Sequence, residues 1–220
     1  MTRTSILLAD DHTLVLEGLK KLLAPEFELV GMVKDGRALL AAAGKLMPDV
    51  VLLDISMPLL NGLEAARQLK KMLPDVQIVF LTMHSEKVYV TEAFRAGASG
   101  YLLKSSAASE LVFAIREVVK GRFYVTPLVA KDVLCTLLDQ PRRPHPAARP
   151  GSAENLTSRQ REVLQLVAEG CANKEIAEIM KISIKTVEFH KSAIMQKLGL
   201  HGTAELTKYA LKHGIAGETE

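Results

Sequence analysis

The sequence predicts an α/β fold, a doubly wound parallel sheet of five strands, followed by a small all-α domain. Short apolar runs of Val, Ile and Leu alternate with helix-like segments through the first half of the chain, as expected for strands buried on both faces of a parallel sheet. Four prolines between residues 141 and 150 then exclude a helix or a central strand. After this interruption, residues 156–213 carry only helix signals.

Strand and helix signals follow one another in regular order from residue 5 to residue 120. The apolar runs predict strands at 5–9, 27–33, 50–54, 77–81 and 100–103. The segments between and after them predict helices at 12–23, 36–46, 61–73, 86–96 and 107–120. Glycines mark several boundaries, and the crossovers between the parallel strands are expected to be right-handed.

The second half of the chain divides into a linker and a helical domain. A helix is expected at 127–138, with Pro127 in its first turn, before the Pro/Arg-rich stretch at 140–151. Thr157 to Gln160 form a predicted capping box that starts the next helix, and Gly170 is its predicted end. The remaining helices are expected at 173–180, 184–198 and 203–213. The predicted domains are therefore 1–124 and 156–220, joined by 125–155.

The composition is that of an ordinary globular protein. The chain has 220 residues, 48% hydrophobic and 24% charged, and a formal net charge of +3, which by itself indicates no nucleic-acid partner. Its two cysteines, Cys135 and Cys171, form no metal motif, which argues against a disulfide scaffold and fits a reducing cytoplasm. The N-terminal apolar stretch is too short for a signal peptide and no run reaches membrane-spanning length, so we expect a cytoplasmic protein without a membrane partner.

Residues with reactive side chains end four of the apolar runs. Asp10 and Asp11 follow the first run, Asp54 ends the third, and Thr82 and Lys104 follow the last two. Because the carboxyl ends of parallel strands meet at one edge of the sheet, and ligands bind at that edge, these side chains are expected to share one pocket. The pocket would hold three carboxylates, a hydroxyl and an ammonium group.

This set of groups predicts phosphoryl chemistry. Asp54 is the candidate nucleophile, because a carboxylate can form an acyl phosphate when the incoming phosphoryl group is positioned and neutralised. Three clustered carboxylates repel one another unless a cation joins them, and hard oxygen ligands favour Mg²⁺. Lys104 can neutralise the phosphoryl oxygens, and Thr82 can donate a hydrogen bond to one of them.

The same residues resemble the receiver domain of two-component response regulators. The resemblance covers residues 4–121 and rests on Asp10-Asp11, Asp54-Ile-Ser-Met-Pro58, Asn61-Gly62, Thr82, Tyr101 and Lys104. It implies that Asp54 accepts a phosphoryl group from a sensor histidine kinase, and that the protein is no enzyme beyond self-phosphorylation and self-dephosphorylation at Asp54. It also implies that Asp11 and Asp54 bind Mg²⁺ with the backbone carbonyl of Ser56, while Asp10 acts largely through water.

Further roles follow from this resemblance. Tyr101 is expected to act as a switch that swings into the space vacated when Thr82 moves toward the phosphoryl group. Ser56 and His84 occupy positions that tune the loss of the phosphoryl group in receivers. Ser105 follows Lys104 where many receivers have a proline in a cis peptide, and a cis bond is costly without proline.

Two consecutive helices in the last domain form a predicted helix-turn-helix. On a helical wheel of 184–198, Val187, Ile194 and Leu198 share one side, which is expected to face the core. The opposite side is expected to enter the major groove of DNA, with Phe189 against a thymine methyl and Glu188 accepting from a cytosine.

The sequences Leu156–Leu164, Asn173–Ala177 and Lys185–His190 resemble the LuxR-type DNA-binding domain. Together with a receiver, this is the architecture of the NarL/FixJ response regulators, which implies a transcriptional regulator that binds double-stranded promoter DNA as a homodimer, with the helix at 203–213 helping dimerisation. The residues expected to contact DNA are Lys174, Lys185, Thr186, Glu188, Phe189, His190, Lys191, Ser192 and Lys197. Lys174, Lys191 and Lys197 are expected on phosphates.

Two alternatives remain open at this point. A phosphatase of the haloacid dehalogenase type also uses an aspartate at a strand end, but it requires a second aspartate two residues later, where this chain has Ser56. A regulator that works without phosphorylation would use the first domain only for dimerisation. The complete set of Asp10, Asp11, Asp54, Thr82 and Lys104 argues against it.

Overall fold

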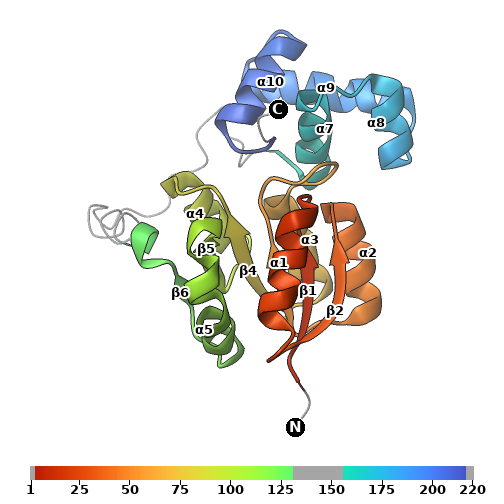
Figure 1. Cartoon of the computed structure of the whole chain (residues 1–220). Coiled ribbons are helices and arrows are strands. Elements are labelled where there is room, and N and C mark those ends of the chain that lie inside the picture. The colour runs from red at the N-terminus through yellow and green to blue at the C-terminus, as the bar shows by residue number, and fades with distance from the viewer. Residues whose placement is uncertain (1–2, 131–155, 217–220) are drawn as a thin grey trace. The chain divides into compact units, whose positions relative to one another are not determined.

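The computed structural model describes residues 3–130 and 156–216. The chain forms two compact units, residues 1–140 and 141–220, and each is described by itself (Figure 1). The predicted Pro/Arg-rich stretch and most of the helix expected at 127–138 lie outside the described residues, although residues 127–130 are helical. No helix in the described ranges combines the length and the apolar character that a membrane crossing requires.

The first unit is a parallel sheet with helices on both faces, as predicted. Its strands are β1 (Ser5–Ala9), β2 (Glu28–Val33), β3 (Val50–Leu53), β4 (Gln77–Thr82), β5 (Gly100–Leu103) and β6 (Tyr124–Val125). All neighbouring pairs are parallel, in the order β2-β1-β3-β4-β5-β6. The prediction of five strands is therefore one strand short. β6 is only two residues long, and it forms because Tyr124 and Thr126 donate backbone hydrogen bonds to Ser99 and Tyr101 at the edge of the sheet.

Helices cover both faces of this sheet (Figure 1), and one hydrophobic core lies on each face. The helices are α1 (Thr13–Leu23), α2 (Gly36–Leu46), α3 (Gly62–Met72), α4 (Lys87–Arg95) and α5 (Ala107–Val119), and a 3-10 turn, η1 (Lys104–Ser106), precedes α5. One core contains side chains from α1 and α5, and the other contains side chains from α2, α3 and α4. Successive strand residues alternate between the cores, so each strand is buried on both faces and needs an unbroken apolar run.

Gly62 shows how closely the segment after β3 folds back on itself. Gly62 is the first residue of α3, and its N–H donates to the carbonyl of Ile55, 2.9 Å away. A Cβ at this position would lie 1.9 Å from the backbone oxygen of Asp54, which no rearrangement of a side chain could relieve. Glycine is therefore required there for the loop to fold over the end of β3.

The second unit contains four described helices, α7 (Ser158–Ala168), α8 (Asn173–Met180), α9 (Ile184–Leu198) and α10 (Thr203–Lys212). The predicted capping box at Thr157 and Gln160 is present. Gly199 ends α9 in the left-handed region at φ 68°, which favours glycine. Val187 and Ile194 are buried as predicted, whereas Leu198 is only half-buried.

Ser183 caps the N-terminus of α9, because its hydroxyl accepts a hydrogen bond of 3.1 Å from the backbone N–H of Thr186. We expect Ser183→Ala to lower the free energy of unfolding of this unit by about 1 kcal/mol, because the N–H loses its partner. Ser192→Ala is the matched control. Ser192 is exposed within the same helix, and its replacement should change stability by less than about 0.5 kcal/mol. Urea unfolding of both variants measures the difference, and equal values would contradict the capping role.

Candidate functional site

The ends of β1, β3 and β5 bring three of the predicted pocket residues into direct contact. The ammonium group of Lys104 lies 2.7 Å from Oδ2 of Asp10 and 2.7 Å from Oδ2 of Asp54. The two carboxylates are 2% and 4% exposed, so Lys104 balances two buried negative charges. The other oxygen of Asp54 accepts from the backbone N–H of Ile55 at 2.7 Å, which fixes the orientation of the carboxylate.

The neighbouring carboxylates stabilise the charged form of Lys104. Burial lowers the pKa of its ammonium group, but the charge of Asp54 and the hydrogen bonds to Asp10 and Asp54 outweigh burial and raise the pKa above its usual value. The raised pKa keeps Lys104 positively charged at neutral pH. Its ammonium group stands where a phosphoryl group on Asp54 would need a positive charge.

Carboxylate oxygens and one imidazole nitrogen form a cluster that could hold a metal ion. Ligand atoms of Asp10, Asp11, His12 and Asp54 all lie within 4.8 Å of one another. Oδ1 of Asp11 is buried and accepts no hydrogen bond of acceptable geometry from a described residue, although Nδ1 of His12 lies 2.8 Å from it. Oxygen donors in this number fit the preference of Mg²⁺. His12 had not been predicted, because a histidine before a helix carries no signal of its own.

Thr82 and Tyr101 lie on the neighbouring strands, and both are fully buried. The hydroxyl of Tyr101 donates to the backbone carbonyl of His84 at 2.8 Å. Burial raises the pKa of this hydroxyl far above its usual value, so it remains a donor. The backbone N–H of His84 donates to Oγ1 of Thr82 at 3.4 Å, which connects both residues to one loop.

The side chain of His84 has partners that the sequence did not predict. Its Nε2 lies 2.8 Å from Oγ of Ser56, and its ring stacks on Tyr89 with the centroids 4.0 Å apart. Ser56 and His84 were expected only as two separate positions near the pocket. In the structure they form a bridge between the loops after β3 and β4. Their backbones are 28 residues apart in sequence, so no local pattern could reveal the contact.

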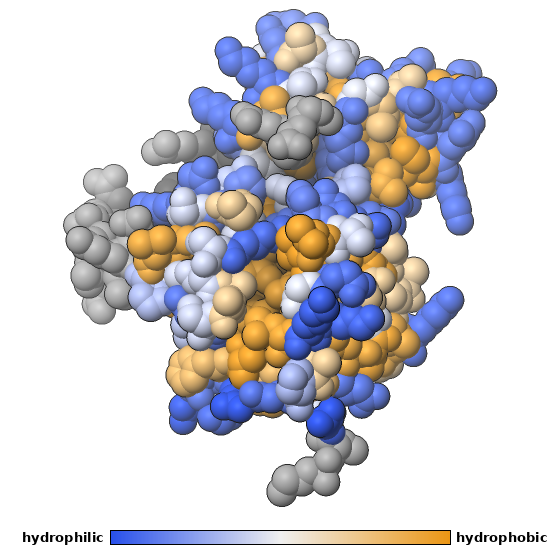
Figure 2. Space-filling model, viewed as in Figure 1, coloured by the Kyte–Doolittle hydropathy of each residue, from blue (hydrophilic) through white to orange (hydrophobic). Residues whose placement is uncertain are grey.

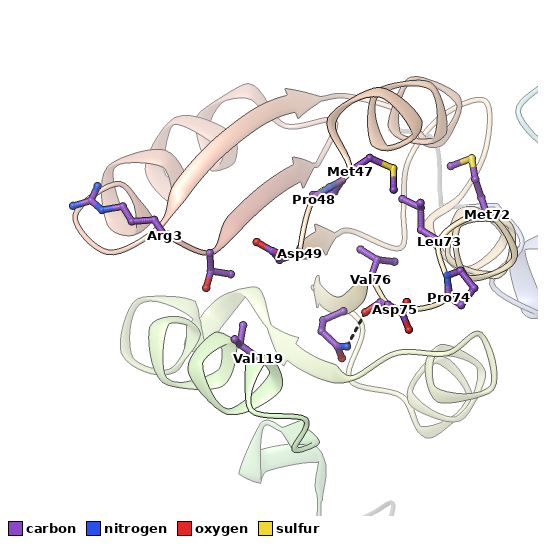
Figure 3. A pocket seen from close by; sticks show the side chains of 12 residues that line it. Arg3, Met47, Pro48, Asp49, Met72, Leu73, Pro74, Asp75, Val76 and Val119 are labelled. Atoms are coloured by element: carbon purple, nitrogen blue, oxygen red, sulfur yellow. Dashed lines mark hydrogen bonds between the residues drawn. The ribbon is translucent and has the colours of Figure 1, made fainter. Parts of the chain in front are cut away.

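A cavity of about 670 Å³ lies at the opposite edge of the sheet, away from these residues (Figure 3). Met47, Pro48, Met72 and Pro74 contribute apolar side chains to its lining. Its Asp49 carboxylate already accepts hydrogen bonds of 2.7 Å from the N–H and hydroxyl of Ser5. The cavity contains none of the predicted site residues, so the reactive groups gather at the carboxyl ends of the strands, as expected.

The outward side of α9 carries most of the residues expected to contact DNA. Lys185, Glu188, Phe189 and Ser192 are exposed, with Phe189 at 69%. Phe189 makes an edge contact with the ring of its neighbour His190, with the centroids 5.9 Å apart, and otherwise presents its ring to solvent among the residues that the structure describes.

The other residues expected to contact DNA differ in their contacts within the protein. Lys174 is exposed. Lys191 donates to Oδ1 of Asn173 at 3.0 Å, and Lys197 donates to Oε1 of Gln160 at 2.9 Å. Thr186 takes part in the cap of α9. His190 is half-buried. Lys197 therefore holds the first turn of α7 through its hydrogen bond to Gln160. The helical wheel of 184–198 did not indicate this contact.

Comparison with known proteins identifies both units. The family described as response regulator receiver domain matches residues 6–116, and the family described as bacterial regulatory proteins, luxR family, matches residues 154–210. The chain belongs to the LuxR-family response regulators. This response regulator is a transcription factor, which removes the phosphatase interpretation and confirms the predicted fold class.

Several known response regulators are similar over nearly the whole chain. The transcriptional regulatory protein DegU of Brevibacillus brevis is 37% identical, covering 96% of this chain and 94% of DegU. The oxygen regulatory protein NreC of Staphylococcus epidermidis is 36% identical, over 94% and 96%.

Solved structures of RcsB are also similar to this response regulator. RcsB from Salmonella enterica serovar Typhimurium, bound to the promoter rprA with the phosphomimetic BeF3⁻, is 29% identical with a TM-score of 0.57, covering 94% of this chain and 98% of RcsB. A structure of RcsB dimers bound to DNA is 29% identical with a TM-score of 0.58, over 96% and 99%.

Proposed function

We propose that this response regulator accepts a phosphoryl group on Asp54 from a histidine kinase and then binds promoter DNA as a dimer. The observation that carries the proposal is the ammonium group of Lys104, 2.7 Å from both Asp54 and Asp10. An Asp54 oxygen forms the new P–O bond as the P–N bond to the kinase histidine breaks, and the imidazole nitrogen keeps the electron pair. Lys104 then neutralises charge on the phosphoryl oxygens.

Asp10, Asp11 and Asp54 would hold Mg²⁺, with the backbone carbonyl of Ser56. The ion would neutralise phosphoryl oxygens beside the carboxylates, which otherwise repel an incoming anion. His12 lies against the same carboxylates, 3.2 Å from Oδ1 of Asp10 and 2.8 Å from Oδ1 of Asp11.

The exposed surface around this pocket fits an approaching partner. Leu14, in the first turn of α1, is 87% exposed, and Figure 2 shows hydrophobic side chains at the surface around α1 among hydrophilic ones. A kinase that delivers its phosphoryl group to Asp54 has to contact the surface around the pocket. Exposed apolar side chains there favour such contacts.

The switch within the unit would involve Thr82 and Tyr101. A phosphoryl group adds a charge of about −1.5 to −2 and three acceptors, and the Thr82 hydroxyl would donate to one of them. The Tyr101 ring would then move into the space that Thr82 leaves. A shift from 1:99 to 99:1 needs about 5.5 kcal/mol. Hydrogen bonds to a charged group contribute about 1.5–3 kcal/mol each, so two at the upper end of this range, or three at about 2 kcal/mol, supply this energy.

Phosphorylation by acetyl phosphate tests the first half of the proposal. With Mg²⁺ present, the full chain should show a retarded band on a phosphate-affinity gel. Removal of the metal with EDTA should abolish the band, because the carboxylates then repel the anion. The same band should return on addition of excess Mg²⁺. A band of equal intensity in EDTA would contradict the proposed metal role.

The second half of the proposal places the exposed side of α9 in the major groove. RcsB, which is similar over nearly the whole chain, is described in complexes with DNA and as dimers on DNA. In this chain Phe189 and Glu188 would contact base edges, with Lys185 and Ser192 beside them. Lys174 would contact a phosphate, as would Lys191 once it leaves Asn173. α10 would contribute to the dimer.

Two substitutions separate base contacts from phosphate contacts. The DNA probe is a duplex selected by the wild-type chain from a random library. Phe189→Ala is expected to weaken binding to this duplex by about 1–3 kcal/mol and to leave non-selected DNA unaffected. Lys174→Ala is expected to weaken both equally and to reduce the salt slope by about 1. Fluorescence anisotropy measures both quantities.

Lys71→Ala is the matched control for charge, because Lys71 is exposed on α3 in the first unit. It removes one positive charge without touching the proposed interface. Binding by Phe189→Ala and Lys174→Ala at the level of this control would contradict the proposed interface.

A further inference from the structure

Thr126 lies directly after β6 and directly before the helical residues 127–130, and it is 1% exposed. The sequence offers no reason to single it out. In the structure, however, its backbone and side chain make hydrogen bonds in three directions: to β5, to α5 and to the helical turn that follows. A buried polar residue with all its groups paired holds these elements in one arrangement.

The contacts with β5 are on both sides of Leu102. The N–H of Thr126 donates to the carbonyl of Tyr101 at 2.9 Å, and the N–H of Leu103 donates to Oγ1 of Thr126 at 3.3 Å. Tyr101 is the proposed switch residue. Leu103 is followed by Lys104, which contacts Asp54 and Asp10. Thr126 therefore contacts the strand at the proposed switch residue, Tyr101, and at Leu103, the residue directly before Lys104.

The contacts with the following turn connect the same residue to the start of the linker. The carbonyl of Thr126 accepts from the N–H groups of Val129 and Ala130, at 3.0 and 3.1 Å. Val129 is buried in the core that also contains Tyr101. In sequence, this turn is the last described part of the first unit before the segment that leads to the second unit.

The hydroxyl explains why threonine suits this position. It donates to Oε2 of Glu110 on α5 at 3.1 Å while accepting from Leu103. The hydroxyl of Tyr124 donates to the same carboxylate oxygen at 3.0 Å. Valine would keep the shape of Thr126 but leave the N–H of Leu103 and one bond of Glu110 without their partner. Serine would keep both hydrogen bonds.

We infer that Thr126 is a positioning residue that transmits the state of β5 to the start of the linker. The inference rests on the proposed phosphorylation of Asp54. A displacement of Tyr101 or Lys104 would move the carbonyl of Tyr101 and the N–H of Leu103, and Thr126 would carry that displacement to Val129 and Ala130. We call this path the relay: a displacement begins at the phosphorylation pocket and reaches the helical residues 127–130 through Thr126.

Hydrogen–deuterium exchange of the full chain, with and without beryllofluoride and Mg²⁺, tests this relay. In the wild type, beryllofluoride should change exchange at amides 100–104 and at amides 128–130 by about threefold or more. Thr126→Val removes the hydroxyl bonds to Leu103 and Glu110 but keeps the backbone bonds, so it should keep the response at 100–104 and clearly reduce the response at 128–130. Thr126→Ser should keep both. Tyr124→Phe, which removes the other hydrogen bond to Glu110, should also keep both.

The response at 100–104 shows that each variant is folded and binds the phosphomimetic. A response of Thr126→Val at 128–130 equal to that of Thr126→Ser would overturn the inference, as would a wild type that responds only at 100–104. A wild type without a response in either segment would contradict the proposed function itself, and Asp54→Asn supplies that baseline.

Discussion

Asp54→Asn should not form the retarded band with acetyl phosphate and Mg²⁺. The amide oxygen is a far weaker nucleophile than the carboxylate, so phosphorylation should fall to background. The fold should persist, because Lys104 keeps its contact with Asp10 at 2.7 Å and the backbone around Ile55 is unchanged. Phosphate-affinity gels measure the first statement and urea unfolding measures the second.

Asp75→Asn is the control for this substitution. Asp75 is exposed and lines the cavity at the opposite edge of the sheet, so the same chemical change there should leave phosphorylation at the wild-type level. A band of undiminished intensity in Asp54→Asn would show that another residue accepts the phosphoryl group and would refute the assignment.

Lys104→Met should lower the free energy of unfolding by about 3 kcal/mol in the absence of divalent cations. The substitution leaves two buried carboxylates, those of Asp10 and Asp54, without their shared cation, and breaking a buried pair in this way costs that much. Addition of Mg²⁺ should recover part of the loss, because the ion supplies the missing charge. Urea unfolding with EDTA and with Mg²⁺ gives both values.

The pH dependence of this effect follows from the raised pKa of Lys104. A group with a raised folded-state pKa contributes its full stability below its unfolded pKa, about 10.4, and loses it as pH rises through the folded value. The difference between the wild type and Lys104→Met should therefore be constant from about pH 7 to 9 and decrease only above about pH 10.4.

Lys120→Met is the matched control, because Lys120 is exposed and forms an ion pair with the half-buried Glu117 at the surface. Its replacement should change stability by less than about 1 kcal/mol, with no response to Mg²⁺. An equal effect of the two substitutions would contradict the central position of Lys104 in the pocket.

The sheet and the meeting of Asp10, Asp54 and Lys104 at its edge could be predicted because their signals are local. A strand buried on both faces needs an unbroken apolar run, and the residue after such a run lies at the functional edge. Thr157, Ser183 and Gly199 likewise mark helix ends by hydrogen bonds or backbone angles within a few residues.

The features that could not be predicted depend on contacts between distant parts of the chain. β6 exists only through its pairing with β5, and two residues cannot carry a periodic signal. The bond between Thr126 and Leu103 spans 23 residues, and that between Lys197 and Gln160 spans 37. On a helical wheel Lys197 is an exposed cation, but only the fold shows that its ammonium group supports another helix.

The affinity of the full chain for its selected duplex, with and without beryllofluoride and Mg²⁺, tests the central claim most directly. Coupling of about 1–3 kcal/mol between the two sites would tighten binding by about 5- to 150-fold, and Asp54→Asn should bind equally under both conditions. Equal affinity of the wild type with and without beryllofluoride would contradict control of DNA binding by Asp54 and favour a first unit that works without phosphorylation.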